Sequence, residues 1–575
     1  MPLYDLAFKP TIYGQHDSSA ALFADGELVF AVEEERLTRQ KHAVDSFPEQ
    51  SIRACLDSQD LDLADVDRVL LPYDPSLRAN IRGHYFRRAL AEPSVSRTLH
   101  RLHQRVTDEV KAKFYPNHHV ESRLAELGRV PPIENLSHHK CHAASAFHPS
   151  EFDEATVVTV DAKGEYESTV VWHGTPDGLE RVRTYEHPNS LGLFFAAVTE
   201  YLGYRMFNGE GKVMGLAPYG EHDEDIERAL RSVVDTGVDY DVTGLVEEFN
   251  AELATQRLEE LFDRPRRETG TDFTQFEKNL AHVAQRLLEE TVVDIVETYC
   301  QCLDTSNVAL AGGVTLNCKM NKAVIESAAV DDVFIQPVAH DAGLALGAGW
   351  LKQSPASVPE MTDAYWGPEY AADDIRRTLD ANKVDYHEPD DLERYVAERL
   401  ADGALVGWFQ GRLELGPRAL GNRSILADPR TTDSRDRVNR NVKHREEWRP
   451  FAPSMLESTA PEYLESGRPR PFMITTADVP PEMADEIPAA LHPADETTRP
   501  QTVSATQNPR YHRLIETFAD ITGVPVLLNT SFNDHAEPIV NTPKEALKDF
   551  YGMGLDTLVL EDFVVEKSST AEADH

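Results

Sequence analysis

The chain is poor in cysteine, and the cysteines it has are not spaced for zinc or for disulfides. Its 575 residues include five cysteines, at positions 55, 141, 300, 302 and 318. None of them forms a CxxC pair, which gives no support for a zinc ribbon, and an odd, unpatterned set gives none for a disulfide framework. We therefore expect a reducing compartment.

Long apolar runs are also absent. No stretch approaches the length of about 20 apolar residues that is needed to span a bilayer. The first residues, MPLYDLAFKP, lack the basic region followed by an apolar core that marks a secretory signal. The sequence therefore predicts a cytoplasmic protein without a membrane segment.

Positive charge is scarce as well. The chain has 57 Lys and Arg against 98 Asp and Glu, a formal net charge of −41. Such a charge repels nucleic acid and anionic membranes, so neither is expected as a partner. The acidic residues are spread along the chain, which is typical of a solvated surface in a salt-rich cytoplasm. An ordinary acidic soluble protein is the alternative.

The residues that are present favour an α/β fold in at least two domains. The chain is 41% hydrophobic and is too long for a single core. Strand-like and helix-like segments alternate over the first 350 residues, and the stretch SSAALFADGELVFAVEEER predicts a hairpin that turns at Asp25-Gly26. Two strand-then-glycine units, near Asp161 and Gly312, suggest a duplicated plan. We place a linker at residues 353–372, between domains at 1–355 and 373–565.

Three segments of the first domain have the composition of phosphate-binding turns. GQHDSSAALF places His16 and Asp17 where a strand enters the hairpin, and an imidazole beside phosphate can act as a general base. VDAKGEYEST ends a strand at Asp161, and LAGGVTLNCKMN leads from a strand through Gly313 into a helix. Each pattern also fits a capped turn or tight strand-helix packing.

The stretch HHKCHAASAF predicts a helix that carries a metal site. His138 and His142 stand four residues apart, so both rings lie on one helix face. Asp341, at a strand-to-helix corner in PVAHDAGLALGAG, is a candidate third ligand. Two histidines and a carboxylate suit iron(II), although zinc or manganese would accept the same set. The alternative is that His139 and His142 form a solvated pair at a helix start.

The second domain concentrates the few cations of the chain. They lie in GRLELGPRALGNRSILADPR and NRNVKHREEWRPFAPS, which contain Arg418, Arg423, Lys443 and Arg449. Arginine side chains bind phosphate with two hydrogen bonds, so these segments suggest a pocket for a small dianion that LLNTSFN could complete. A structural ion-pair network is the alternative.

Taken together, these segments resemble the nodulation-type and antibiotic-tailoring O-carbamoyltransferases. HDSSAAL, EEERLTRQKH, HHKCHAASAF, ELGPRALGNRSIL, VKHREEWRPFAPS and LNTSFN occur in the order of that family, and the resemblance covers nearly the whole chain. It implies a duplicated, actin-like N-terminal domain and a YrdC-like α/β C-terminal domain. It also implies that ATP and carbamoyl phosphate give carbamoyl-adenylate, whose carbamoyl group passes to a hydroxyl of a small-molecule acceptor.

The resemblance also assigns roles to individual residues. It implies an iron(II) site formed by His138, His142 and Asp341, with Mg²⁺ accompanying ATP, and it makes His16 the catalytic base. The implied nucleotide contacts of the first domain are Lys41, Asp161, Gly313 and Asn317. The implied contacts for carbamoyl phosphate and ATP in the second domain are Arg418, Lys443, Arg449, Arg499 and Asn529.

The sequence departs from the family pattern at a few positions and leaves several properties open. Ala162 and Lys163 alter the second phosphate turn, Cys141 stands where Ala is usual, and Pro500 follows Arg499. A threonylcarbamoyl-type tRNA modification enzyme and a non-catalytic nucleotide-binding regulator are the alternative functions. The acceptor is not indicated, and a homodimer is the default expectation for a soluble oligomer.

Overall fold

The computed structural model describes residues 2–10, 16–77, 117–247, 251–443, 449–534 and 536–567. The chain divides into two compact units, one made of residues 1–34 and 43–361 and the other of residues 35–42 and 362–575. Residues 78–116 lie outside the described residues. In the described part of the chain, no helix combines the length and the apolar character needed to cross a membrane.

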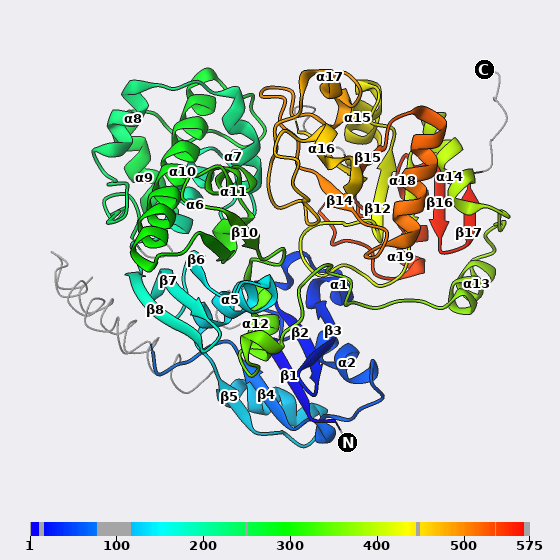
Figure 1. Cartoon of the computed structure of the whole chain (residues 1–575), viewed down its shortest axis with the longest axis horizontal. Coiled ribbons are helices and arrows are strands. Elements are labelled where there is room, and N and C mark those ends of the chain that lie inside the picture. Colours follow the sequence, from blue (N-terminus) through cyan, green and yellow to red (C-terminus); the bar gives the residue numbers. More distant parts are fainter. Residues whose placement is uncertain are drawn as a thin grey trace. The chain divides into compact units, whose positions relative to one another are not determined.

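The N-terminal unit contains two five-stranded sheets that have the same topology (Figure 1). The first sheet has the order β3 (Glu27–Glu33), β2 (Ser19–Ala24), β1 (Tyr4–Lys9), β4 (Arg68–Leu71) and β5 (Ile133–Asn135). The second has the order β8 (Gly178–Glu186), β7 (Glu167–Thr175), β6 (Ala155–Val160), β9 (Asn307–Ala311) and β10 (Asp332–Ile335). In both sheets the first three strands along the chain are antiparallel neighbours and the last two join in parallel. The predicted duplicated, actin-like plan is confirmed.

The predicted hairpin joins β2 to β3 through the expected turn. Asp25 and Gly26 have φ angles of 50° and 89°. Positive φ at both central residues is the signature of a type I′ turn, whose twist matches that of the paired strands. A short-range pattern therefore fixed this part of the first sheet.

Two helices form a layer between the two sheets of the N-terminal unit. α12 (Leu344–Trp350) packs on β1, β2 and β4, whereas α5 (His138–Phe147) packs on β6, β7 and β9. The helices also pack on each other, and a Cβ atom at Gly347 of α12 would lie 1.9 Å from the carbonyl oxygen of Cys141 in α5. Because no side chain fits between the two backbones, this contact sets the spacing of the layer.

Further helices of the N-terminal unit lie within the described residues. They are α2 (Glu49–Asp57), α6 (Leu191–Tyr201), α7 (Glu210–Leu216), α8 (Glu224–Arg231), α9 (Ala251–Phe262), α10 (Gln275–Leu303) and α11 (Cys318–Ile325). The long helix α10 packs on α6, α7 and α11 and so joins most of this group. It begins with a capping box between Thr274 and Glu277.

The C-terminal unit is built on one mixed sheet of seven strands. Their order is β14 (Gln501–Val503), β13 (Ala452–Leu456), β15 (Val526–Ser531), β12 (Arg423–Ala427), β11 (Val406–Phe409), β16 (Thr557–Leu560) and β17 (Phe563–Glu566). Neighbouring residues of β11 enter different cores, since Trp408 packs with helices α14 (Leu392–Ala401) and α18 (Pro509–Thr522) and Phe409 packs with α13 (Ala372–Ala381) and α19 (Pro543–Gly552). Side chains that alternate along a strand thus bury both faces of the sheet. The expected α/β second domain is present.

One short segment near the N-terminus belongs to the C-terminal unit, which the sequence did not predict. It comprises residues 35–42 and includes most of α1 (Glu34–Thr38). Arg36, which is 3% exposed, donates a 2.7 Å hydrogen bond to the carbonyl of Gly416. Arg39 donates to the carbonyls of Pro538 and Ile539 at 2.8 and 2.6 Å. These charged hydrogen bonds explain why the segment joins this unit.

Candidate active site

Two buried histidines lie one turn apart at the start of α5. His138 and His142 are 6% and 0% exposed, and their ring centroids are 4.8 Å apart. The helix begins at His138 because the buried carboxylate of Glu165 accepts its backbone N–H at 3.1 Å. Burial raises the pKa of Glu165 to about 7. The predicted i, i+4 pair is therefore present, on an end of the helix that a carboxylate caps.

Two carboxylates from distant parts of the chain face these rings. Asp161 follows the last residue of β6, and its Oδ2 lies 3.1 Å from Nε2 of His138 and 3.8 Å from Nε2 of His142. Asp341 opens the turn before α12, and its Oδ1 lies 3.7 and 3.6 Å from the same two nitrogens. One ligand atom from each of the four residues lies within 4.8 Å of all the others.

Charge inside this cluster shifts its pKa values strongly. Burial lowers the pKa of His138, but the Asp341 and Asp161 carboxylates outweigh this effect and raise it to about 9. Burial likewise opposes the negative charge of Asp161, yet the hydrogen bond from His138 and the electrostatic attraction of His142 hold its pKa well below its usual range. The two carboxylates of the cluster therefore favour the protonated form of His138.

The cluster has the properties of a site for a divalent cation. Both ring nitrogens of His142 are buried and have no hydrogen-bond partner among the described residues. A buried nitrogen without a partner is costly, and a metal ion would satisfy it. Imidazole and carboxylate together suit iron, zinc and manganese. The structure thus assembles the three predicted ligands and adds Asp161, which sequence reasoning had placed in the nucleotide site.

His139 does not share this site, and it is not solvated. It is 0% exposed, and its Nδ1 pairs with the hydroxyl of Thr159 at 2.9 Å. Burial lowers its pKa well below the usual value, so the ring is neutral. A Cβ atom at Gly164 would lie only 2.7 Å from this ring, which explains the glycine there. The alternative of a solvated His139–His142 pair is therefore wrong.

His16 forms a second group with Asp17 in the N-terminal unit. Its Nδ1 lies 2.5 Å from Oδ2 of Asp17, and its ring centroid lies 5.8 Å from that of Phe207. Burial lowers the pKa of His16, but the Asp17 carboxylate more than offsets this and the net shift is upward. A histidine held by a carboxylate on one nitrogen has the arrangement of a general base.

Lys9 connects these two groups, and sequence reasoning missed it. This lysine is 3% exposed, its Nζ lies 3.0 Å from Oδ2 of Asp341, and it donates a hydrogen bond to the carbonyl of His16. The signal was available in the sequence, because a lysine that ends the apolar strand YDLAFK is an unusual residue to bury. Its partner could not be read from the sequence.

The remaining candidates of the first domain are distributed between the two units. Gly313 donates its backbone N–H to Oδ1 of Asp161 at 3.3 Å, so it lies beside the cluster. Asn317 caps α11 through the N–H of Met320 and exchanges two amide hydrogen bonds with Gln285, at 2.8 and 2.9 Å. Lys41 is exposed and belongs to residues 35–42, in the C-terminal unit.

The altered turn after Asp161 is held in place by its neighbours. The hydroxyl of Ser190 lies 2.9 Å from the carbonyl of Ala162, to which it donates, and 3.2 Å from that of Asp161. A Cβ atom at Gly192 would lie 2.9 Å from the Ala162 backbone. The turn is thus packed closely against the start of α6, and Ala162 fits this contact.

In the C-terminal unit, the segment ELGPRALGN folds around a buried carboxylate. Glu414 is 1% exposed, and its Oε1 accepts backbone N–H groups from Leu420, Asn422 and Arg423 at 2.7 to 3.0 Å. These hydrogen bonds close the segment into a loop, and Arg418 lies near the middle of that loop, half-buried. The predicted cation therefore sits on a loop that the chain fixes from inside.

Lys443 lies against the end of β15, and Asn529 is a residue of that strand. The Nζ of Lys443 donates to the carbonyls of Ser531 and Asn533 at 2.7 and 3.0 Å. Asn529 is 1% exposed, and its amide donates to the Ser454 hydroxyl at 3.0 Å and to the Ala419 carbonyl at 3.3 Å. Because Ala419 follows Arg418, these contacts connect three of the predicted residues to one strand end.

Arg449 and Arg499 are both partly exposed in the same unit. The backbone carbonyl of Arg449 accepts a hydrogen bond from Asn439 at 3.4 Å. Arg499 precedes the buried Pro500 and β14, and no hydrogen bond or ion pair joins its guanidinium to another described residue. Part of the neighbouring motif VKHREEWRPFAPS, residues 444–448, lies outside the described residues.

Arg423 is a structural residue, in contrast to the interpretation that grouped it with phosphate-binding cations. It is 0% exposed, and its guanidinium stacks 3.6 Å from the ring centroid of Phe409. Two of its nitrogens donate to four backbone carbonyls, those of Gln410, Asn422, Gly411 and Pro368. Burial lowers its pKa to about 10. Two nitrogens of this guanidinium therefore already donate hydrogen bonds to the protein's own backbone.

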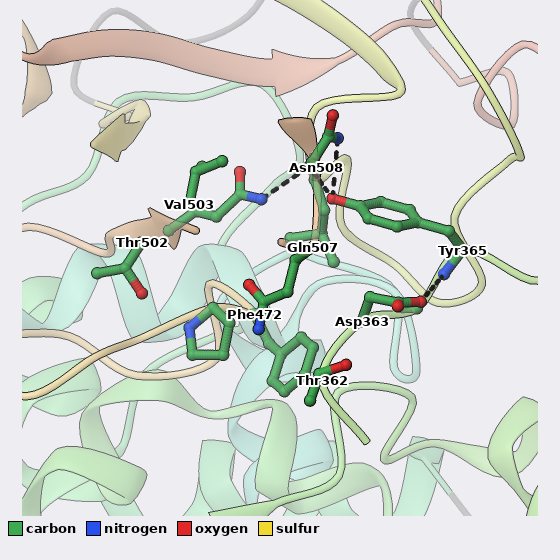
Figure 2. Close-up of a pocket in the computed structure, with 12 residues that line it drawn as sticks. Thr362, Asp363, Tyr365, Phe472, Thr502, Val503, Gln507 and Asn508 are labelled. Carbon is green, nitrogen blue, oxygen red and sulfur yellow. Dashed lines mark hydrogen bonds between the residues drawn. The ribbon is translucent and has the colours of Figure 1, made fainter. Parts of the chain in front are cut away.

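A small pocket adjoins this network in the C-terminal unit (Figure 2). Tyr365 points its hydroxyl toward Asn508, which donates to it at 3.3 Å, and Phe472 lines the other side. The lining also includes Leu420 and Gln501, and the Gln501 amide donates to the Leu420 carbonyl at 2.7 Å. None of the predicted site residues lines this pocket.

Comparison with known families decides the class of enzyme. A family model described as carbamoyltransferase N-terminus matches residues 9–350, and one described as carbamoyltransferase C-terminus matches residues 397–567. The chain belongs to the carbamoyltransferase family. The family resemblance inferred from the motifs is thus confirmed, and the protein is a carbamoyltransferase.

Several relatives match this carbamoyltransferase over most of its length. Nodulation protein NolNO of Sinorhizobium fredii is 36% identical, over 97% of this chain and 80% of that protein. Nodulation protein NolO of Bradyrhizobium diazoefficiens is 38% identical, over 75% and 79%. An uncharacterized protein of Synechocystis is 37% identical, over 96% and 95%. A crystal structure of full-length HypF covers 61% of this chain with a TM-score of 0.34 and 12% identity, too distant to bear on the site.

Proposed function

We propose that this carbamoyltransferase forms carbamoyl-adenylate from ATP and carbamoyl phosphate in its C-terminal unit and transfers the carbamoyl group to a hydroxyl of a small molecule in its N-terminal unit. The observation that carries the proposal is the four-residue cluster of His138, His142, Asp161 and Asp341, with the His16–Asp17 pair joined to it through Lys9. In a carbamoyltransferase, a cation site beside a general base suits transfer from an anionic donor.

The first step needs a site for several phosphate groups. Carbamoyl phosphate and water give carbamate and inorganic phosphate, and a carbamate oxygen then attacks the α-phosphorus of ATP while pyrophosphate leaves. The candidates for binding these anions are Arg418, Lys443, Arg449, Arg499 and Asn529. Mg²⁺ enters with ATP as part of the substrate. Arg499 supports this assignment because its guanidinium has no partner among the described residues.

The second step needs a base for the acceptor hydroxyl. The hydroxyl oxygen attacks the carbamoyl carbon, the bond from that carbon to the adenylate oxygen breaks, and AMP leaves. Since Asp17 holds Nδ1 of His16, the proton passes from the hydroxyl to Nε2. Asp17 also stabilises the imidazolium that forms.

The cation site belongs to the same step. His138, His142, Asp161 and Asp341 would hold the ion, and on the family resemblance iron(II) is the expected one. When bound, a divalent ion would supply a positive charge for the phosphate oxygens of the adenylate. A small-molecule acceptor is favoured over tRNA because a net charge of −41 opposes binding to nucleic acid.

The test follows both steps in the purified full-length chain. The protein is incubated with ATP, Mg²⁺ and isotopically labelled carbamoyl phosphate, and pyrophosphate is measured. A metabolite extract and an RNA fraction of the source organism are then added separately, and label is sought in each by mass spectrometry. We expect pyrophosphate release that depends on carbamoyl phosphate, and label in a small molecule.

Variants separate the two steps. We expect His16→Ala to release pyrophosphate normally and to lose labelled product, and Lys443→Met to lose both. His222→Ala is the matched control, because this histidine is in the same unit as His16 and is 43% exposed. Release of pyrophosphate without carbamoyl phosphate, normal transfer by His16→Ala, or label in RNA would each contradict the proposal.

A further inference from the structure

Lys9 is buried at the point where the two groups of the transfer site meet. Only 3% of it is exposed, and its ammonium contacts Oδ2 of Asp341 at 3.0 Å and the carbonyl of His16. Burying a lysine is unfavourable unless its charge and its donors are satisfied. The negative charge of the Asp341 carboxylate therefore balances the buried ammonium of Lys9 on the side of the cluster.

The sheet register shows how Lys9 reaches this position. In the antiparallel pair of β1 and β2, Lys9 lies directly opposite Ser19. Residues that face each other in such a pair have their side chains on the same side of the sheet. The Ser19 hydroxyl donates to the Ala342 carbonyl at 2.7 Å, so both side chains hold the turn that begins at Asp341.

The same arrangement recurs at the other carboxylate of the cluster. Asp161 directs Oδ2 toward the histidines, while its Oδ1 accepts the backbone N–H of Gly313. Asp341 directs Oδ1 toward the histidines, while its Oδ2 is taken by Lys9. In each case one oxygen faces the cluster and a fixed donor holds the other. Such outer contacts orient the ligands of a metal site.

We propose that Lys9 is a positioning residue, which fixes the Asp341 carboxylate so that a single oxygen faces the metal site and ties the backbone of His16 to that ligand. This inference rests on the proposed function, because it assumes that the cluster binds a divalent cation. Lys9 is not itself one of the four residues of the cluster. The two connected groups are the ligand set and the base of the transfer step.

Two physical effects of removing Lys9 have opposite signs, which makes the inference testable. Loss of the ammonium removes a positive charge near the cation, and this effect alone would strengthen cation binding. Loss of the contact also frees the carboxylate to turn, and this effect weakens binding. If orientation is the role of Lys9, the second effect dominates.

The experiment measures Co²⁺ binding by the metal-stripped full-length chain, without substrate. Titration followed by visible absorption reports both the affinity and the coordination of the ion. For Lys9→Met we expect a Co²⁺ affinity about 10- to 100-fold below that of the wild type, with a changed spectrum. Lys9→Arg, which keeps the charge and the donors, is expected to recover most of the affinity.

Arg68→Met is the matched control. Arg68, in β4, donates two hydrogen bonds of 2.7 and 2.6 Å to the carboxylate of Asp5. Asp5 is 2% exposed and lies on β1, the strand that also carries Lys9. This variant likewise strips a cation from a buried carboxylate, but at the other end of β1. We expect its Co²⁺ affinity and spectrum to match those of the wild type.

A second readout compares the two steps. Lys9→Met is expected to release pyrophosphate at the normal rate and to lose carbamoyl transfer. If Lys9→Met does not accumulate as folded protein, Lys9→Gln, which keeps a donor there, is judged by the same criteria.

The outcomes are distinct. Co²⁺ affinity that is unchanged or higher in the Lys9 variant, or equal losses in the Lys9 and Arg68 variants, would overturn the role given to Lys9. Failure of the wild-type chain to bind Co²⁺ would instead overturn the metal site of the proposed function.

Discussion

Replacing Gly347 with alanine should disturb the cluster of His138, His142, Asp161 and Asp341 although this glycine is not part of it. The added Cβ atom would lie 1.9 Å from the carbonyl oxygen of Cys141, in α5. Ordinary contact begins at 3.4 Å, so the backbones of α5 and α12 would have to separate by about 1.5 Å. Because α5 carries His138 and His142 and α12 follows Asp341, the separation moves ligands apart.

The structure indicates the size of this effect. A carbonyl oxygen of a packed helix cannot rotate away, so the strain is not relieved locally, and we expect a loss of about 3 kcal/mol or more in the free energy of unfolding. The histidine nitrogens already lie 3.6 and 3.7 Å from Oδ1 of Asp341. A displacement of about 1 Å at such a site lowers affinity or rate by roughly 100-fold.

The assay compares Gly347→Ala with Gly211→Ala by thermal unfolding and Co²⁺ titration. A Cβ atom at Gly211, in α7, would meet no atom within 4 Å. Alanine there should leave Co²⁺ affinity unchanged and stabilise the protein by up to about 1 kcal/mol, since glycine is a poor helix residue. If Gly347→Ala bound Co²⁺ as tightly as the wild type, close packing of α5 against α12 would not be what sets the ligand distances.

Three further predictions concern single residues. Because Asp17 raises the pKa of His16 against the effect of burial, kcat/KM for transfer should rise with pH through an apparent pKa above 6.5. Asp17→Asn should move this limb to lower pH, and pH profiles of both proteins check it. Arg499→Met should weaken carbamoyl phosphate or ATP binding by about 10-fold or more in calorimetric titrations, with thermal stability unchanged, because a charged hydrogen bond is lost only in the complex. Burial and Glu537 raise the pKa of Asp549, in α19, from 3.8 to about 6. Wild-type stability should therefore fall as pH rises through this range, and Asp549→Asn should be more stable by about 2 kcal/mol at pH 7 but not at pH 4, as urea unfolding would show.

Short-range patterns predicted much of the local structure. Asp25-Gly26 indicated the turn of the first hairpin because few residue pairs accept two positive φ angles. The spacing of His138 and His142 indicated a shared helix face, and the structure places both rings in one cluster. The alternation of strand and helix patterns likewise indicated two α/β domains. These properties depend on neighbours within a few residues, so the sequence displays them directly.

Other parts of the site depended on contacts that no local pattern contains. Asp161 has the sequence of a strand-end phosphate turn, yet it faces two histidines of a different element. Arg418 and Arg423 are cations of the same motif, ELGPRALGNRSIL, and the sequence does not distinguish their roles. The fold, however, buries Arg423 among backbone carbonyls. Residues 35–42 lie near the N-terminus and nevertheless belong to the C-terminal unit.

The sequence by itself determined the family of this protein, the duplicated α/β plan and the histidine pair, because each is encoded in ordered motifs or in spacings of a few residues. Only the tertiary structure decided that Asp161 joins His138, His142 and Asp341 in one cluster and that Lys9 contacts Asp341. The physical reason is that the charge of a buried carboxylate must be balanced by whichever groups the fold brings within about 4 Å. Those groups come from strands and helices that are up to about 330 residues apart in the chain, as Lys9 and Asp341 are.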